Sequence, residues 1–232
     1  MKPICIIPAR GGSKGIPKKN IRLMARKPLI AYTIESSLKS KIYSHVFVST
    51  EDEQIAKISK RYGAEIPFLR PRKLAGDTIP IQDVLFHDVK KLLSLGYQFD
   101  TFVWRDCTVP FIRNEDIINS IKLIHRKNCT TVIGVYNQHL NPYYNMVEKT
   151  SKGFLKLVKR NKERPTSRQK APIVYQMNGL HVFNVKKFLK TGKMNLSRSV
   201  PFEIPIETGL MIDTELEFKI AQMIIQNKLL KI

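Results

Sequence analysis

A short apolar run followed by a glycine-rich basic loop opens this chain and constrains its fold more than any other feature. Residues 3–7 are strand-like, and the loop from Pro8 to Asn20 contains three glycines, one serine and four cationic residues. A helical pattern follows from Pro28 to Lys39. Such a strand–loop–helix order is typical of the first unit of a nucleotide-binding sheet, because the loop offers backbone N–H groups and positive charge to a polyphosphate.

Strand-like and helix-like segments alternate along most of the chain. The expected strands are residues 3–7, 45–49, 101–104, 130–135 and 179–183, with a short extended run at 65–69. The expected helices are residues 28–39, 50–61, 81–95, 114–126 and a last helix after residue 214. This order predicts an α/β protein with a three-layer α/β/α, Rossmann-like arrangement around a mainly parallel sheet. Ligands bind such sheets at the carboxyl ends of the strands, so the loops 8–20 and 105–113 and the segment ending at residue 213 are expected to share one crevice.

Local patterns predict how three of these helices begin. Thr50 with Glu53, and Thr214 with Glu217, match the capping box, and Asn114 is expected to cap the helix that follows it. In the last helix, four apolar residues are expected to face the core: Leu216, Ile220, Met223 and Ile224.

Residues 136–178 interrupt the alternation. The segment is polar and basic and contains Pro142, Pro165 and Pro172. We expect it to be an insertion of one or two hairpins that projects from the sheet, within a single domain of 1–232.

Composition narrows the function classes. The chain contains no apolar run near the roughly 18 residues that a membrane span requires, and its N-terminus does not resemble a signal peptide, so a cytoplasmic protein without a membrane partner is expected. Three widely spaced cysteines fit neither a disulfide framework nor a metal cluster. Cys107 has no evident histidine partner, so a nucleophilic role for it is disfavoured.

The formal net charge of +21 allows a different class of function, a basic nucleic-acid-binding protein. The lysines, however, are spread over helix faces rather than gathered in a tail. The densest cluster, between residues 156 and 170, lacks the interleaved aromatic side chains that would stack on bases. Nucleic-acid binding is therefore the less favoured alternative.

The first loop contains the groups that nucleotidyl transfer requires. The reaction needs cations for the leaving pyrophosphate more than it needs a covalent catalyst. The expected catalytic cations are Arg10, Lys14 and Lys19, with the N–H groups of Gly11, Gly12 and Ser13 beside them. The loop is neither a Walker A motif nor a dinucleotide fingerprint, because both glycine spacings are absent.

The full string Pro-Ala-Arg-Gly-Gly-Ser-Lys-Gly-x-Pro-x-Lys-Asn closely resembles the signature of the acylneuraminate cytidylyltransferases, which activate sialic acid and related nonulosonic acids. The resemblance continues in five motif blocks over nearly the whole chain. It implies a nucleotide-diphospho-sugar transferase type of fold with a β-rich dimerisation insertion. It also implies a homodimer, a Mg²⁺ cofactor and the substrates CTP and a nonulosonic acid. The anomeric hydroxyl of the acid would attack the α-phosphorus of CTP and release pyrophosphate.

The resemblance assigns nucleotide-binding residues to two segments. Arg70-Pro71 and Leu74-Ala75-Gly76-Asp77 match the family in order and spacing. The implied nucleotide-binding residues are Ala9, Gly11, Gly12, Ser13, Asn20, Arg70, Asp77 and Thr78.

Sugar binding is implied for two other blocks, with one departure from the family. The family shows Leu-Gln-Pro-Thr-Ser-Pro-Leu-Arg, where this chain has Asp106 for Gln and Cys107 for Pro. Later, Arg168 is suited to a substrate carboxylate, because its guanidinium forms a planar fork. The implied sugar-binding residues are Asp106, Arg168, Gln169, Tyr175 and Asn178.

The metal motif departs from the family as well. The family form Asp-Ile-Asp-Thr-Glu-Leu-Asp-Phe uses two aspartates for Mg²⁺, but this chain has Met211 in place of the first and keeps the second as Asp213. A thioether is a poor ligand for this hard ion. We expect Asp106 to supply the missing oxygen, since both carboxylates follow strands. An inactive homologue is an alternative that Met211 leaves open.

The resemblance leaves alternatives for the nucleotide base and for the sugar. GTP is an alternative to CTP, because relatives that act on legionaminic acid with guanosine carry Asp in the block that contains Asp106. The ketodeoxyoctonate cytidylyltransferases are less favoured, because their first loop lacks the Gly-Gly-Ser-Lys arrangement. The sugar could be of the sialic, legionaminic or pseudaminic type.

Overall fold

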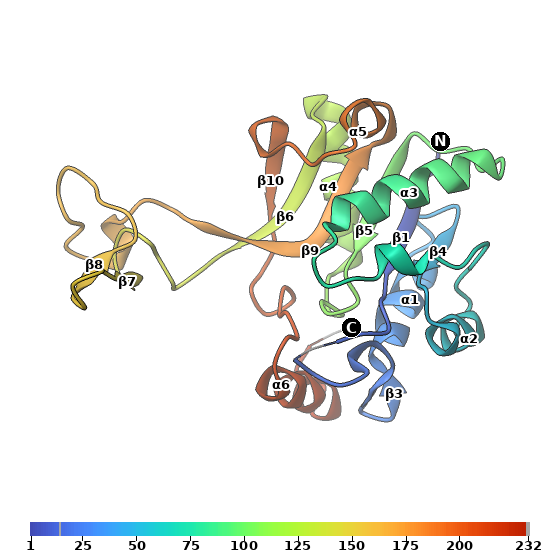
Figure 1. Ribbon diagram of the computed structural model, residues 1–232, viewed down its shortest axis with the longest axis horizontal. Coiled ribbons are helices and arrows are strands. Elements are labelled where there is room, and N and C mark those ends of the chain that lie inside the picture. The colour runs from blue at the N-terminus through green and yellow to red at the C-terminus, as the bar shows by residue number, and fades with distance from the viewer. Residues whose placement is uncertain (14, 231–232) are drawn as a thin grey trace.

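A six-stranded sheet forms the centre of the computed structural model, which describes residues 1–13 and 15–230 (Figure 1). Its strand order is β10-β6-β9-β5-β1-β4, and all neighbours are parallel except the two that flank β9. The strands are β1 (Ile4–Pro8), β4 (Val46–Ser49), β5 (Thr101–Arg105), β6 (Thr131–Asn137), β9 (Tyr175–Asn184) and β10 (Ser199–Glu203). The predicted mainly parallel sheet is confirmed.

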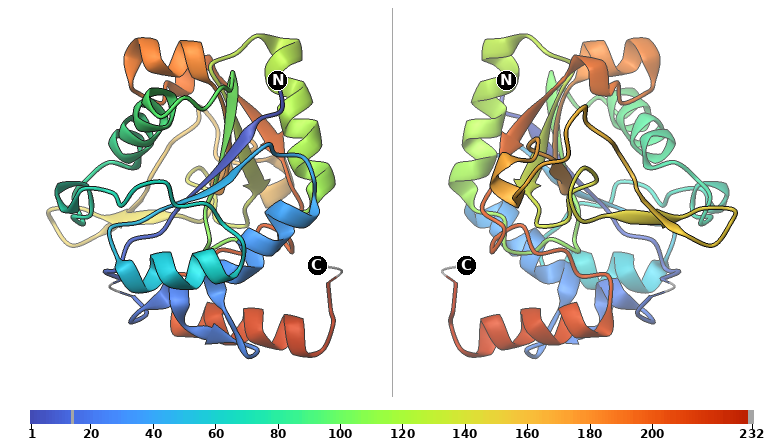
Figure 2. Two further views of the ribbon diagram at one scale, coloured as in Figure 1. Left: turned by 90° about the vertical axis from the view of Figure 1, so that its right-hand side faces the viewer. Right: turned by 90° about the vertical axis from the view of Figure 1, so that its left-hand side faces the viewer.

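Helices cover both faces of this sheet, which confirms the three-layer prediction (Figure 2). The α-helices are α1 (Leu29–Lys39), α2 (Glu53–Arg61), α3 (Ile81–Ser94), α4 (Asn114–Lys127), α5 (Val185–Thr191) and α6 (Glu215–Gln226). Successive residues of a strand point to opposite faces. Cys5 and Ile7 of β1 accordingly pack with residues of α1, α2 and α4, whereas Ile4 and Ile6 pack with residues of α3 and α5.

The last helix packs beside the sheet on a third apolar cluster. The capping box at its start is confirmed, since the Thr214 hydroxyl accepts the N–H of Glu217 at 3.3 Å and Glu217 Oε2 accepts the N–H of Thr214 at 2.8 Å. The predicted inward face is wrong for three residues, which are exposed: Leu216, Ile220 and Met223. Phe218 and Ala221 are buried instead, in a cluster with Met24. Met24 belongs to β2 (Leu23–Met24), which pairs with β3 (Lys27–Pro28).

Two predicted helix caps are also wrong. Asp52, not Thr50, caps α2, because its Oδ1 accepts the N–H of Ile55 at 2.9 Å. Asn114 is the first residue of α4, and Arg113 precedes it at the cap position without a side-chain cap bond. The extended run at 65–69 is reduced to one bridge between Phe47 and Glu65.

Residues 138–174, here called the arm, leave the sheet between β6 and β9 and project from it (Figure 1). The arm contains one hairpin, β7 (Val147–Lys149) paired with β8 (Leu155–Leu157). Its apolar side chains are largely exposed, 72% for Phe154 and 71% for Leu155. The ends of the predicted insertion, residues 136–137 and 175–178, belong to β6 and β9.

Several loops reach the same edge of the sheet. β1, β4, β5 and β6 all end there, and β10 runs parallel to β6, so residues 204–213 reach that edge too. Neither α5 nor β10 was expected from the sequence. Among the described residues, no helix is both long and apolar enough to cross a membrane.

Candidate active site

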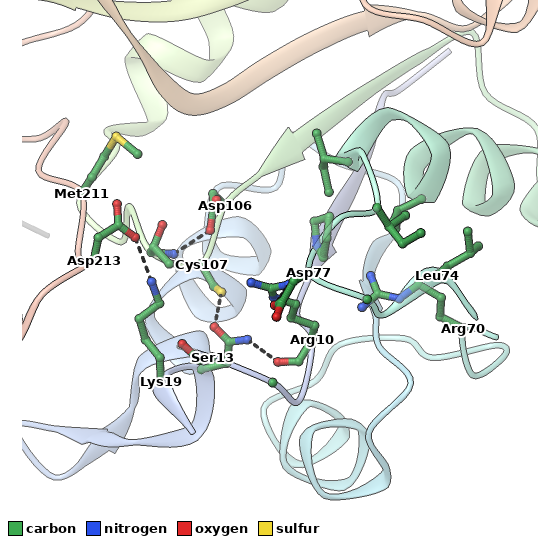
Figure 3. Close-up of a pocket in the computed structure, with 18 residues that line it drawn as sticks. Arg10, Ser13, Lys19, Arg70, Leu74, Asp77, Asp106, Cys107, Met211 and Asp213 are labelled. Carbon is green, nitrogen blue, oxygen red and sulfur yellow. Dashed lines mark hydrogen bonds and ion pairs between the residues drawn. The ribbon is translucent and has the colours of Figure 1, made fainter. Parts of the chain in front are cut away.

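A cavity of about 350 Å³ opens where these loops meet (Figure 3). Predicted site residues that line it are Arg10, Gly12, Ser13, Lys19, Asn20, Arg70, Asp77, Asp106 and Asp213. They come from loops after β1 and β5, from the segments before α3 and α6, and from the chain just before the 3₁₀ turn at Arg72–Leu74. The expected shared crevice is therefore present. Lys14 lies outside the described residues.

The N-terminal loop and the segment before α6 are joined at Lys19. Its ammonium lies 2.9 Å from Asp213 Oδ1 and donates to the carbonyl of Ile212 at 2.9 Å. Gly15 permits this approach, because a Cβ there would lie 2.5 Å from the carbonyl oxygen of Asp213. Only 13% of the Lys19 side chain is exposed, so its charge is held at the cavity rather than in solvent.

A second ion pair crosses the cavity. Arg10 Nη1 lies 2.6 Å from Asp77 Oδ1, which links the loop after β1 to the loop before α3 (Figure 3). Both side chains are partly exposed, so the pair is weak and can exchange with an anionic ligand at little cost.

Asn20 is fixed from both sides of its amide. Its Nδ2 donates to the carbonyl of Arg10 at 2.9 Å, and Cys107 Sγ donates to its Oδ1 at 3.0 Å. Burial, reinforced by the negative charge of Asp106, raises the pKa of the Cys107 thiol well above its usual value. The thiol therefore stays protonated near neutral pH and is a hydrogen-bond donor rather than a nucleophile.

Glu51 was not among the predicted site residues, although it contacts two of them. Glu51 Oε1 accepts the N–H of Gly11 at 2.7 Å, and its Oε2 lies 2.6 Å from Arg70 Nη2. The N–H of Gly11 is thus directed at a carboxylate, and Gly11 does not line the cavity. The available signal was the position of Glu51, an acidic residue just after a buried strand at the carboxyl edge.

Asp106 is held at the end of β5 by the backbone. Its Oδ1 accepts the N–H of Thr108 at 2.9 Å, and its own N–H donates to the carbonyl of Gly179 at 2.8 Å. Any Cβ at Gly179 would lie 2.5 Å from the Cβ of Asp106, so only glycine fits beside it. Burial raises the pKa of Asp106, while the bonds from Thr108 and the charge of Lys19 oppose the rise.

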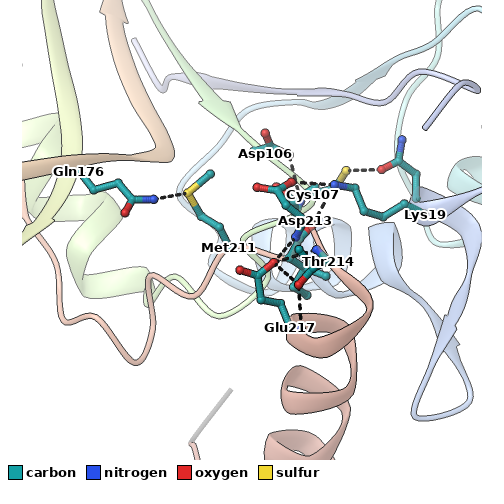
Figure 4. A network of polar contacts seen from close by, with 11 residues as sticks. Lys19, Asp106, Cys107, Gln176, Met211, Asp213, Thr214 and Glu217 are labelled. Atoms are coloured by element: carbon teal, nitrogen blue, oxygen red, sulfur yellow. Dashed lines mark hydrogen bonds and ion pairs between the residues drawn. The ribbon is translucent and has the colours of Figure 1, made fainter. Parts of the chain in front are cut away.

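The two carboxylates at the cavity are compatible with Mg²⁺. Asp106 and Asp213 both line it, and the charge of Asp213 is near enough to raise the pKa of Asp106 (Figure 4). No group of three or more His, Cys, Asp or Glu side chains suited to a metal exists in the part of the chain that the structure describes. Two carboxylates suffice for Mg²⁺, because this ion keeps several waters and takes further oxygens from substrate phosphates. Met211 also lines the cavity, but its sulfur accepts a bond from Gln176 Nε2 at 3.5 Å.

The predicted sugar-binding residues other than Asp106 do not line this cavity. Arg168 and Gln169 are exposed on the arm, and Arg168 Nη1 lies 2.6 Å from His139 Nδ1. Tyr175 is partly exposed at the root of the arm. Asn178 is buried, and its amide donates to the carbonyl of Gly209 at 2.8 Å.

Besides Gly11, two of the predicted nucleotide-binding residues do not line the cavity. Ala9 is buried and its N–H donates to the carbonyl of Ser49 at 2.9 Å, so it anchors the loop to β4. Thr78 is exposed beside Asp77. Neither residue lines the cavity.

Known proteins resemble this chain over nearly its full length. Residues 4–231 match the family model described as Cytidylyltransferase. The chain is 34% identical to the post-translational flagellin modification protein B of Campylobacter coli over 97% of this chain and 95% of that protein. It is 32% identical to the CMP-N,N'-diacetyllegionaminic acid synthase of Campylobacter jejuni, with the same coverage.

A solved structure supports the same fold. CMP:2-keto-3-deoxy-manno-octonic acid synthetase, complexed with CTP, is similar with a TM-score of 0.72 and 16% identity over 98% of this chain and 100% of that one. Together with the family match, the nucleotidyltransferase architecture and the cavity identify the class of enzyme. The chain belongs to the cytidylyltransferase family.

Proposed function

We propose that this enzyme transfers CMP from CTP to the anomeric hydroxyl of a nonulosonic acid and releases pyrophosphate. The observation that carries the proposal is one cavity lined by the cations Arg10 and Lys19 together with the carboxylates Asp106 and Asp213. Relatives named for legionaminic, pseudaminic and sialic acid activation support the sugar class.

The cations of the cavity would bind the triphosphate. Arg10 and Lys19 each pair with a carboxylate, so an incoming phosphate can take the place of Asp77 and Asp213 without leaving either cation unpaired. Asn20 and Arg70 would contact the base and ribose, because both line the same cavity as these cations. The chain then contributes position and charge, which are the main requirements of nucleotidyl transfer.

Asp106 and Asp213 would hold Mg²⁺. When bound, the ion would help to neutralise the charge that develops on the leaving pyrophosphate. Lys19 is bonded to Asp213, so it can release that carboxylate as it moves to the phosphates.

We infer that the arm forms a homodimer and completes the sugar site. Arg168 and Gln169 are exposed on the arm and away from the cavity of their own chain. In a dimer, the arm of one subunit would bring these residues to the cavity of the other, where Arg168 could bind the sugar carboxylate. The exposed apolar side chains of the arm, such as Phe154, would be buried by the same contact. We place the reaction in the cytoplasm, where CTP is made.

Pyrophosphate release tests the proposal. The protein is incubated with Mg²⁺ and either CTP or GTP, together with sialic, legionaminic or pseudaminic acid. Release with CTP and one of the acids, and none without the acid, is the expected result. Release only with GTP would show that the nucleotide substrate is GTP rather than CTP. Tight retention on DNA at physiological salt, without any release of pyrophosphate, would favour the nucleic-acid-binding alternative.

A further inference from the structure

Glu51 does not line the nucleotide cavity, but it contacts Arg70, which does, and Gly11, which directly precedes the lining residues Gly12 and Ser13. We propose that Glu51 is a positioning residue that holds the glycine loop and Arg70 in the geometry that binds the nucleotide. This role rests on the proposed function, since it assumes that the cavity takes a nucleoside triphosphate.

The first contact of Glu51 shapes the glycine loop. The N–H of Gly11 donates to Glu51 Oε1 at 2.7 Å. The loop lies so close to the start of α2 that a Cβ at Gly11 would be 2.7 Å from Asp52 Oδ2. Gly12 and Ser13, the next residues, line the cavity. The bond to Glu51 therefore fixes the backbone immediately before the residues that face the ligand.

The second contact balances the charge of Arg70 and fixes the direction of its side chain. Only 3% of the Arg70 side chain and 12% of the Glu51 side chain are exposed, and Nη2 and Oε2 are 2.6 Å apart. The backbone N–H of Arg70 donates to the carbonyl of Thr50 at 2.8 Å, while its Nε has no hydrogen-bond partner. Removing one partner of a buried charge pair leaves the other uncompensated, which is more harmful than losing a surface pair.

Both contacts use the carboxylate of Glu51, so replacing this residue would weaken both of them at once. Without the negative charge of Glu51, the Arg70 guanidinium would turn toward solvent or another carboxylate, and the loop at Gly11 would become more mobile. Nucleotide binding would then have to order both parts, and that cost would weaken binding. The chemical step would change little, because Glu51 does not line the cavity and the cations Arg10 and Lys19 stay in place.

The test compares Glu51→Gln with the matched control Glu53→Gln, two residues along the chain and exposed. Calorimetry gives the Kd for CTP with Mg²⁺, and turnover gives KM and kcat. For Glu51→Gln, we expect Kd and KM for CTP to rise roughly 10-fold while kcat falls less than about 3-fold. Glu53→Gln should match the wild type. In Arg70→Gln, adding Glu51→Gln should weaken binding much less than it does in the wild type.

A lower melting temperature for Glu51→Gln with an unchanged Kd for CTP would overturn the proposal, because it would make the role of Glu51 purely structural. If Glu51→Gln does not fold, Glu51→Asp keeps the charge on a shorter side chain and should raise Kd without changing kcat. A wild-type protein that binds CTP but forms no product would refute the proposed reaction, while the Kd values would still decide the role of Glu51. A wild type that binds neither CTP nor GTP would overturn both.

Discussion

The two ends of β9 differ sharply although they belong to one strand. From Asn178 to Phe183, the strand is buried between β5 and β6, whereas Tyr175 and Met177 at its other end are 41% and 49% exposed. The exposed end pairs only with β6, because β5 pairs with Leu180–Asn184. Hence neighbouring strands and helices cover the buried end, while the end that leads into the arm is open to solvent.

The cavity and the arm also differ in how far their positive charges are paired with carboxylates. At the cavity, Arg10, Lys19 and Arg70 each pair with a carboxylate of the same chain. Residues 138–174 contain nine Lys or Arg and two Asp or Glu, and one of the few arm ion pairs joins Lys156 to Glu148 at 3.0 Å. The charges at the cavity are thus balanced within one chain, while the arm leaves positive charge and apolar surface exposed.

Removing a cavity carboxylate should have the largest effect. We expect Asp213→Asn and Asp106→Asn each to lower kcat/KM on the order of 100-fold or more, because each removes a charged oxygen from the proposed Mg²⁺ site. Pyrophosphate release at varied Mg²⁺ measures this. Glu215→Gln is the control, since Glu215 is partly exposed and pairs with Arg22 outside the cavity. Unchanged Mg²⁺ dependence in Asp106→Asn would show that Met211 is not compensated at this position.

The buried end of β9 should make folding sensitive to acid. Burial lowers the pKa of His181 to about 4, its Nδ1 has no hydrogen-bond partner, and its ring stacks on Trp104 at 4.3 Å. The unfolded chain binds this proton near pH 6.5 and the folded chain only near pH 4, so stability falls as pH drops through that window, by about 3 kcal/mol in all. We expect His181→Phe to flatten this part of the profile.

Denaturant unfolding at pH 7.5 and pH 4.5 measures that change, with His125→Gln as the control because His125 is exposed on α4. If His181→Phe loses as much stability between these two pH values as the wild type does, the buried imidazole is not the cause.

The arm should show a smaller, concentration-dependent effect. Replacing Phe154 and Leu155 with serine should weaken dimerisation roughly 10-fold or more, because exposed apolar anchors dominate most interfaces. Light scattering during size-exclusion chromatography measures the mass, and turnover should fall with the dimer fraction. Leu229→Ser is the control, since Leu229 is equally exposed but lies outside the arm. A wild type that is monomeric at all concentrations and fully active would contradict this account of the arm.

The parts of the fold that sequence predicted correctly are those with strong local signals. Buried strands such as β1 are apolar on both faces, and the glycine loop after it marks the carboxyl edge. Parallel topology then brings Lys19, Asp106 and Asp213 together, so much of the cavity could be inferred without coordinates.

The parts that sequence missed depend on tertiary contacts. β10 is a short edge strand that contains Pro201, and α5 is a helix of seven residues, so both lack a clear pattern. In α6, apolar residues lie on more than one face, and only packing against Met24 selects Phe218. Glu51 makes both of its contacts with distant segments, since Gly11 is 40 and Arg70 is 19 residues away along the chain.

Arg105 is the clearest case of a residue whose contacts no sequence pattern predicts. It is fully buried at the end of β5, where its Nη1 donates to Ser36 Oγ at 2.7 Å and Ser37 Oγ at 2.8 Å. The family string quoted above has leucine at this place, and an apolar residue would have been expected there. Serines on α1, 68 and 69 residues away in sequence, make the buried guanidinium possible.

Identification of the product tests the central claim most directly. The wild-type protein is incubated with Mg²⁺, CTP and each nonulosonic acid in turn. The products are then separated, and their molecular masses are measured by mass spectrometry. The account predicts one conjugate of CMP and an intact nonulosonic acid, formed in equal amount with pyrophosphate. A conjugate formed only from GTP, or no conjugate with any of the three acids while the protein binds CTP, would contradict it.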